Sequence, residues 1–105
     1  MYLRSKVHPI SEPILNKLAS VSLSGEALFI LSRLGPRGAF AFETVRDIAA
    51  DEATDFVLRE SAIWTLEEFG ASAKPAIPLL RTLSGHHQGR VREAATKALT
   101  SLEKQ

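Results

Sequence analysis

The sequence predicts an all-α domain built as a short array of stacked helices. Residues 58–66 (LRESAIWTL) return 33 positions later as residues 91–99 (VREAATKAL). Residues 27–35 (ALFILSRLG) match residues 62–70 (AIWTLEEFG) at a spacing of 35. Spacings in the thirties are typical of stacked helical repeats. No window shows the alternation of apolar and polar residues that marks a half-buried strand, so we expect helices throughout.

The first half of the chain carries three predicted helices. Residues 11–21 begin at Ser11, a good N-cap, with a proline in the first turn and a stripe of isoleucine and leucine behind it. Residues 24–34 form the second helix, which ends at Gly35 because glycine accepts the left-handed conformation beyond a helix and the following proline cannot continue it. Residues 38–50 form the third.

The second half repeats this pattern after a polar turn. Residues 55–69 form a helix closed by Gly70, residues 74–84 form one with prolines at its start, and residues 90–103 form the last. Trp64 sits among apolar residues at helical spacing, so we expect it in the core.

The helices alternate between two types, which sets the domain organisation. We name A-type the helices 24–34, 55–69 and 90–103, and B-type the helices 11–21, 38–50 and 74–84. The 105 residues then read as one domain: a B-type helix over 11–21, a repeat over 24–50, a repeat over 55–84 and a capping helix over 90–103.

The repeating unit, Val/Leu-Arg-Glu-x-Ala-x-x-x-Leu followed by a small-residue turn and Ala-Ile-Pro-Leu-Leu-x-x-Leu, resembles the HEAT repeat. It is most similar to the short bacterial variety called the phycobilisome-lyase-like HEAT repeat. The resemblance covers roughly residues 11–103. It implies a right-handed α-α superhelix, a short HEAT-like α-solenoid of about six helices. It also implies one functional alternative, an accessory factor that assists bilin attachment or removal.

Differences between the copies predict where each helix lies. The helix 24–34 is apolar on nearly every side, so we expect it to be buried on every side in the middle of the stack. In the last helix Thr96 and Lys97 replace Ile63 and Trp64, and a polar outer face is what a terminal repeat needs. We expect this helix to cap the array.

The N-terminal end has no such polar cap. The B-type helix 11–21 lacks an A-type partner, and only residues 1–10 precede it. Either that segment folds over the end, or the exposed face pairs with a second copy to form a homodimer.

Arginines recur at equivalent positions of the A-type helices, as Arg59 and Arg92. In the family that the chain resembles, such arginines form a ladder with acidic residues of neighbouring turns. Candidates for those acids are Asp51, Glu52 and Asp55. The functional alternative is contact with an anion.

Arg46 and Arg81 are also equivalent, on the B-type helices that line the concave face in HEAT-like solenoids. With Lys17, Asp47 and Thr82 they form our candidate partner-binding row, although a solvated face would look the same.

Catalysis, cofactors and metals have little support in the sequence. There is no cysteine, and the pair His86-His87 lacks the third ligand that a metal site needs. No His-Glu dipeptide of the kind found in iron-binding HEAT-like enzymes occurs, and no nucleophile sits in an elbow motif. We expect no enzyme activity, no cofactor and no metal.

Composition and charge limit the classes of partner that we expect for this protein. The net charge of +1 argues against nucleic acid, and no apolar run approaches the ~20 residues that span a bilayer. Residues 1–10 do not resemble a secretory signal, so we expect a cytoplasmic location. The function that follows is a scaffold that binds another protein or peptide, with a bilin lyase-like factor and a self-assembling spacer as alternatives.

Overall fold

The computed structural model describes residues 25–105. The predicted helix 11–21 and Lys17 lie outside the described residues. Residues 25–105 form helices joined by turns, without a strand, which confirms the all-α prediction. None of the helices in this part of the chain is long and apolar enough to cross a membrane.

The helices follow the predicted order. They are α3 (Gly25–Leu34), η1 (Gly35–Ala41), α4 (Phe42–Ala50), α5 (Phe56–Glu68), η2 (Gly70–Ala76), α6 (Ile77–Leu83) and α7 (Gly89–Glu103). The two η elements are 3-10 helices. The predicted helices 38–50 and 74–84 therefore each begin as a tighter 3-10 segment before the α-helix starts. Within η2, Pro75 cannot donate the backbone hydrogen bond of a regular α-helix, whereas the proline of η1 lies in its first turn, where no such bond is needed.

Two glycines make the turns that follow α3 and α5. Gly35 has a φ of 58° and Gly70 a φ of 67°, both in the left-handed region. They occupy the same place in the two repeats, which confirms the sequence prediction that glycine ends these helices.

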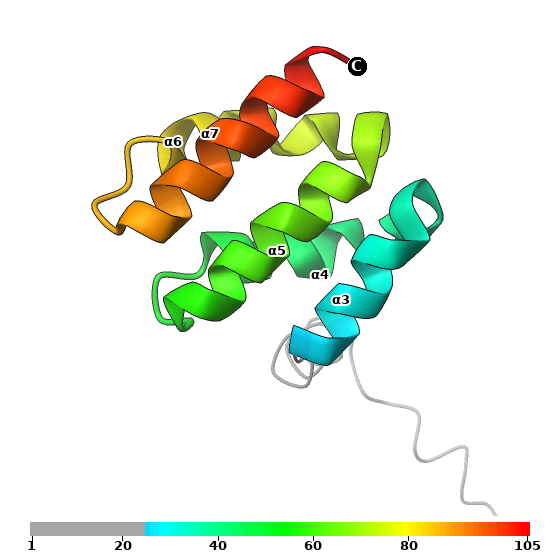
Figure 1. The fold of residues 1–105 in the computed structure, drawn as a ribbon, viewed down its shortest axis with the longest axis horizontal. Coiled ribbons are helices and arrows are strands. Elements are labelled where there is room, and N and C mark those ends of the chain that lie inside the picture. The colour runs from blue at the N-terminus through cyan, green and yellow to red at the C-terminus, as the bar shows by residue number, and fades with distance from the viewer. Residues whose placement is uncertain (1–24) are drawn as a thin grey trace, which may run out of the picture.

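The helices form two layers. Figure 1 shows α3, α5 and α7 side by side, with α4 and α6 behind them. α5 packs against both α3 and α7, while α4 packs against α5 and α6 packs against α7. The largest fully buried apolar side chains come from both layers: Leu28, Val45, Ile63, Leu66, Phe69, Leu80, Val91 and Leu102.

Two predictions about burial are wrong. α3 is not buried on every side, since Phe29 is 61% exposed and Ile30 is 60% exposed. Trp64 is not a core residue, since it is 46% exposed. The physical reason is the same in both helices: Leu28 and Leu31 of α3, like their counterparts in α5, already fill the side that faces the second layer.

Candidate partner-binding site

The predicted row on α4 and α6 lies at the surface, but its arginines already have carboxylate partners. An Nη nitrogen of Arg46 is 3.3 Å from an Oδ oxygen of Asp47, and its guanidinium lies 5.5 Å from the ring centroid of Phe42. An Nη nitrogen of Arg81 is 3.0 Å from an Oε oxygen of Glu103 in α7. These side chains are between 39% and 62% exposed, so both ion pairs lie in contact with solvent. The arginines are therefore not unpaired charges enclosed in a pocket that could bind an anionic group of a partner.

Thr82, the other described member of the row, has its hydroxyl already hydrogen-bonded within its own helix. The Thr82 hydroxyl donates to the Pro78 carbonyl one turn earlier in α6, at 3.3 Å. The structure thus gives each described member of the row a partner within its own helix or in α7, and Lys17 lies outside the described residues.

Of the two arginines in the ladder that the resemblance implies, Arg59 makes the expected contact with an acid. This side chain is only 3% exposed, and its Nε donates to the Ala49 carbonyl at 3.1 Å. Its two Nη nitrogens donate to the carboxylate of Glu52 at 3.2 and 3.3 Å. Arg92 instead donates to the carbonyls of His86 and His87, at 3.0 and 3.4 Å. Both arginines therefore tie an A-type helix to the turn before it.

His86 belongs to the same network. Its Nδ1 accepts from the Gln88 backbone N–H at 3.0 Å, which leaves Nε2 to donate to Glu52 at 3.1 Å. The hydrogen bonds from His86 and then from Arg59 hold the pKa of Glu52 below its ordinary value of 4.5. Because both ring nitrogens of His86 are used, this histidine has no lone pair for a metal. Across residues 25–105, no group of three or more histidine, aspartate or glutamate residues could hold a metal ion.

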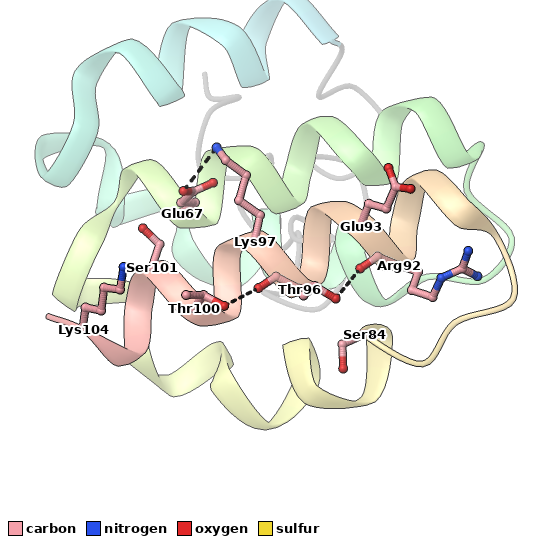
Figure 2. A pocket seen from close by; sticks show the side chains of 9 residues that line it. All are labelled: Glu67, Ser84, Arg92, Glu93, Thr96, Lys97, Thr100, Ser101 and Lys104. Carbon is pink, nitrogen blue, oxygen red and sulfur yellow. Dashed lines mark hydrogen bonds and ion pairs between the residues drawn. The ribbon is translucent and has the colours of Figure 1, made fainter.

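The outer side of α7 carries an open polar depression of about 600 Å³. Figure 2 shows the side chains that line it: Glu67, Ser84, Arg92, Glu93, Thr96, Lys97, Thr100, Ser101 and Lys104. Lys97 points toward Glu67 of α5, at 3.6 Å, and the hydroxyls of Thr96 and Thr100 donate to carbonyls of their own helix. Ligand sites are lined mostly by hydrophobic and aromatic residues, and this depression has none, so we interpret it as a solvated face.

An apolar groove lies between α3 and α5. Its volume is about 280 Å³, and it is lined by Gly25, Phe29, Ser32, Ser61, Trp64 and Thr65. The two aromatic rings stand at equivalent positions of the two repeats, 35 residues apart. The guanidinium of Arg33 lies 5.7 Å from the Phe29 ring centroid, which places a positive charge beside the groove.

Sequence reasoning missed this groove, although one signal was available. The residue of α7 at the same repeat position as Phe29 and Trp64 is Lys97, which is exposed. A lysine at that position indicates a side that faces solvent, because lysine is almost never fully buried without a partner.

Comparison with family models, curated proteins and solved structures gave no match. The fold of residues 25–105 defines an all-helical protein.

Proposed function

We propose that this chain is a protein-binding module without catalysis of its own, built as a right-handed HEAT-like superhelix. Support comes from the recurrence of one unit, in which an A-type helix, a left-handed glycine and a 3-10 turn lead into a B-type helix. Arrays of this kind offer extended, rigid surfaces. A preformed surface loses little conformational entropy when a partner binds.

The observation that carries the proposal is the pair of exposed aromatic rings at the groove between α3 and α5. Trp64 and Phe29 leave about half or more of their surfaces in water. Aromatic residues, tryptophan above all, are enriched at the centres of protein interfaces, where they supply much of the binding energy.

The partner that suits this groove is a segment of another protein with an apolar side chain and a neighbouring carboxylate. The apolar side chain would enter between Phe29 and Trp64, and the carboxylate would meet Arg33 at the rim. Docking of apolar anchors into a hydrophobic groove is a recurrent way of recognising peptides.

A displayed peptide library tests this proposal. Peptides selected on the wild-type chain and counter-selected on Trp64→Lys are expected to carry an apolar residue next to an acidic one. Trp64→Lys copies the residue that α7 has at the equivalent position, so the fold should tolerate it. Because Trp64 is the only tryptophan, its fluorescence should shift to the blue when a selected peptide fills the groove.

Affinity measurements then separate the two candidate surfaces. Phe29→Lys should weaken binding of a selected peptide at least about tenfold. The matched variant, Arg46→Glu combined with Arg81→Glu, should leave the affinity within about twofold, because it alters only exposed charges of the row. The opposite pattern would assign binding to the row on α4 and α6 and would overturn the groove.

A further inference from the structure

One exposed stripe along α3 consists of four side chains: Glu26, Phe29, Ile30 and Arg33. Their spacings of three and four residues place them on one side of the helix, and we call them the α3 stripe. Phe29 is 61% and Ile30 is 60% exposed. Figure 1 shows α3 at the edge of the layer that it forms with α5 and α7. The stripe therefore presents an apolar centre with an acid at one end and a base at the other.

The two charged residues of the α3 stripe do not neutralise each other. Glu26 and Arg33 are seven residues apart, which corresponds to about 10 Å along the helix. Within residues 25–105 neither of them forms an ion pair. The guanidinium of Arg33 lies 5.7 Å from the Phe29 ring centroid instead. Each charge can therefore pair with an opposite charge that another molecule brings.

The order of residues in the α3 stripe is symmetric about its centre, which lies between Phe29 and Ile30. Glu26 and Arg33 lie at equal distances from that centre, about 3.5 residues or about 5 Å along the helix. An antiparallel copy of α3 that shares this centre places its arginine opposite Glu26 and its glutamate opposite Arg33. Phe29 of each copy then packs against Ile30 of the other. The stripe is thus complementary to itself under a twofold axis, as the interfaces of symmetric homodimers are.

The other A-type helices show that this side of the repeating unit accepts a neighbouring A-type helix. Thr65 of α5, the equivalent of Ile30, is 1% exposed, and its hydroxyl donates to the Leu28 carbonyl of α3 at 3.2 Å. Ala98 of α7, the next equivalent, is 0% exposed, and α7 packs against α5. A second α3 beside Ile30 would cover this position as α3 covers Thr65.

Two other arrangements of a second copy match the α3 stripe less well. A parallel copy of α3 would place like charges opposite each other at both ends, which is destabilising. Head-to-tail stacking would bring the free side of α7, with the exposed Thr96, Lys97 and Thr100, against the apolar centre. That side is polar, so it would leave the two apolar side chains of the stripe without an apolar contact.

We propose that the α3 stripe is the contact surface of a weak homodimer, in which two copies of α3 pair antiparallel around a twofold axis. Four side chains from each copy make a small contact, and small interfaces are typical of transient complexes. An interface of this symmetry is closed, so association stops at two copies. Phe29 also lines the peptide groove, so a bound peptide and a second copy compete for that ring, but the dimer itself requires no peptide.

Sedimentation equilibrium over a concentration series tests the dimer on the protein alone. The average mass is expected to rise from the 11.5 kDa of one chain toward twice that value, without larger species. A mass that stays at that of one chain up to millimolar concentration would overturn the proposal. Growth beyond two copies would also overturn it, because a twofold interface cannot produce larger assemblies.

Charge reversal at the two ends of the stripe identifies the contact surface. Because of the twofold axis, either Glu26→Arg or Arg33→Glu turns two attractive pairs into two repulsive ones, so each should raise the dimer Kd at least about tenfold. Mixed one to one, the two variants regain both attractive pairs and are expected to form a heterodimer. The matched controls on α7, Glu93→Arg and Lys104→Glu, should leave the dimer Kd within about twofold. Equal weakening by the controls, or a mixture that does not associate, would refute the antiparallel pair.

Ile30→Lys separates the dimer from peptide binding. Ile30 belongs to the α3 stripe but is not among the residues that line the groove. This variant is expected to remain a monomer at concentrations where wild type dimerises, and to bind a selected peptide with unchanged affinity. A dimer that persists in this variant would show that the contact lies elsewhere on the molecule.

Discussion

At the scale of single residues, Arg59 shows how one side chain joins two turns of the array. Its guanidinium is buried, while its partner Glu52 is 67% exposed. The carboxylate therefore stays in water, and the arginine alone is withdrawn from it. The Nε–H of Arg59 also satisfies the Ala49 carbonyl near the end of α4. Since an unsatisfied buried carbonyl is costly, Arg59 has a structural role rather than one in anion binding.

Glu52 makes the stability of the fold depend on pH. Hydrogen bonds from His86 and Arg59 lower its pKa in the folded protein. The resulting stabilisation is complete above the ordinary value of 4.5 and is lost as the pH falls through the lowered, folded-state value. We expect urea denaturation to find wild type more stable than Glu52→Gln at pH 5, with the difference shrinking toward pH 3.

The control for this prediction is Asp47→Asn, whose carboxylate pairs with an exposed arginine. This variant reports the effect of removing one negative charge from an exposed ion pair at each pH. A constant gap between wild type and Glu52→Gln would mean that these hydrogen bonds do not favour the carboxylate.

At the scale of elements, the 3-10 segments bring the two repeats close to each other. η1 and η2 contact each other, and Gly38 of η1 lies against α3. A Cβ at Gly38 would be 2.7 Å from the Leu31 carbonyl oxygen and 3.0 Å from the Phe69 ring. The short connection therefore requires a residue without a side chain at this point.

Gly38→Ala is expected to reduce the free energy of unfolding by about 1–3 kcal/mol, because the backbone of α3 must move away. The matched control is Gly89→Ala, where the nearest atom is the end of the Arg92 side chain at 3.5 Å. That substitution should be neutral or slightly stabilising, since alanine is the better helix former. Chemical denaturation of both variants measures the difference, and equal stabilities would contradict the close approach.

At the scale of the whole molecule, the two ends of the described array are built differently. The outer side of α7 carries hydroxyls and charges where α5 carries Ile63 and Trp64. Polar terminal faces keep repeat arrays from growing by stacking. We therefore expect the exposed hydroxyls of Thr96 and Thr100 to disfavour stacking of a further copy on α7.

Thr96→Ile combined with Lys97→Trp gives α7 the residues of α5 and should promote self-association. Light scattering over a concentration series is expected to show a mass that rises relative to wild type. Lys104→Trp, which adds a single aromatic at the C-terminal end of the array, should not have this effect. An unchanged mass for the double variant would show that other features limit stacking.

The sequence by itself determined the helices, their order and the glycines that end α3 and α5. These features depend on local physics: hydrophobic periodicity, capping and the left-handed conformation open to glycine. The pairing of Arg59 with an acid was implied by the resemblance to the HEAT repeat, and the structure selects Glu52 from the three candidates. The 3-10 segments and the pairing of Arg81 with Glu103 were not predictable in this way, since they depend on packing between elements.

Only the tertiary structure decided which apolar residues face outward. α3 is apolar around most of its circumference, and α5 mixes polar and apolar residues on every side, so their patterns do not distinguish a buried side from an exposed one. Packing against neighbouring helices decides which side is buried. α5 contacts α4, α3 and α7, and its Ile63 and Leu66 are fully buried. Trp64 remains at the surface, where it lines the groove with Phe29. The exposure of a side chain depends on which elements pack beside its helix, and the sequence of that helix alone does not specify those neighbours.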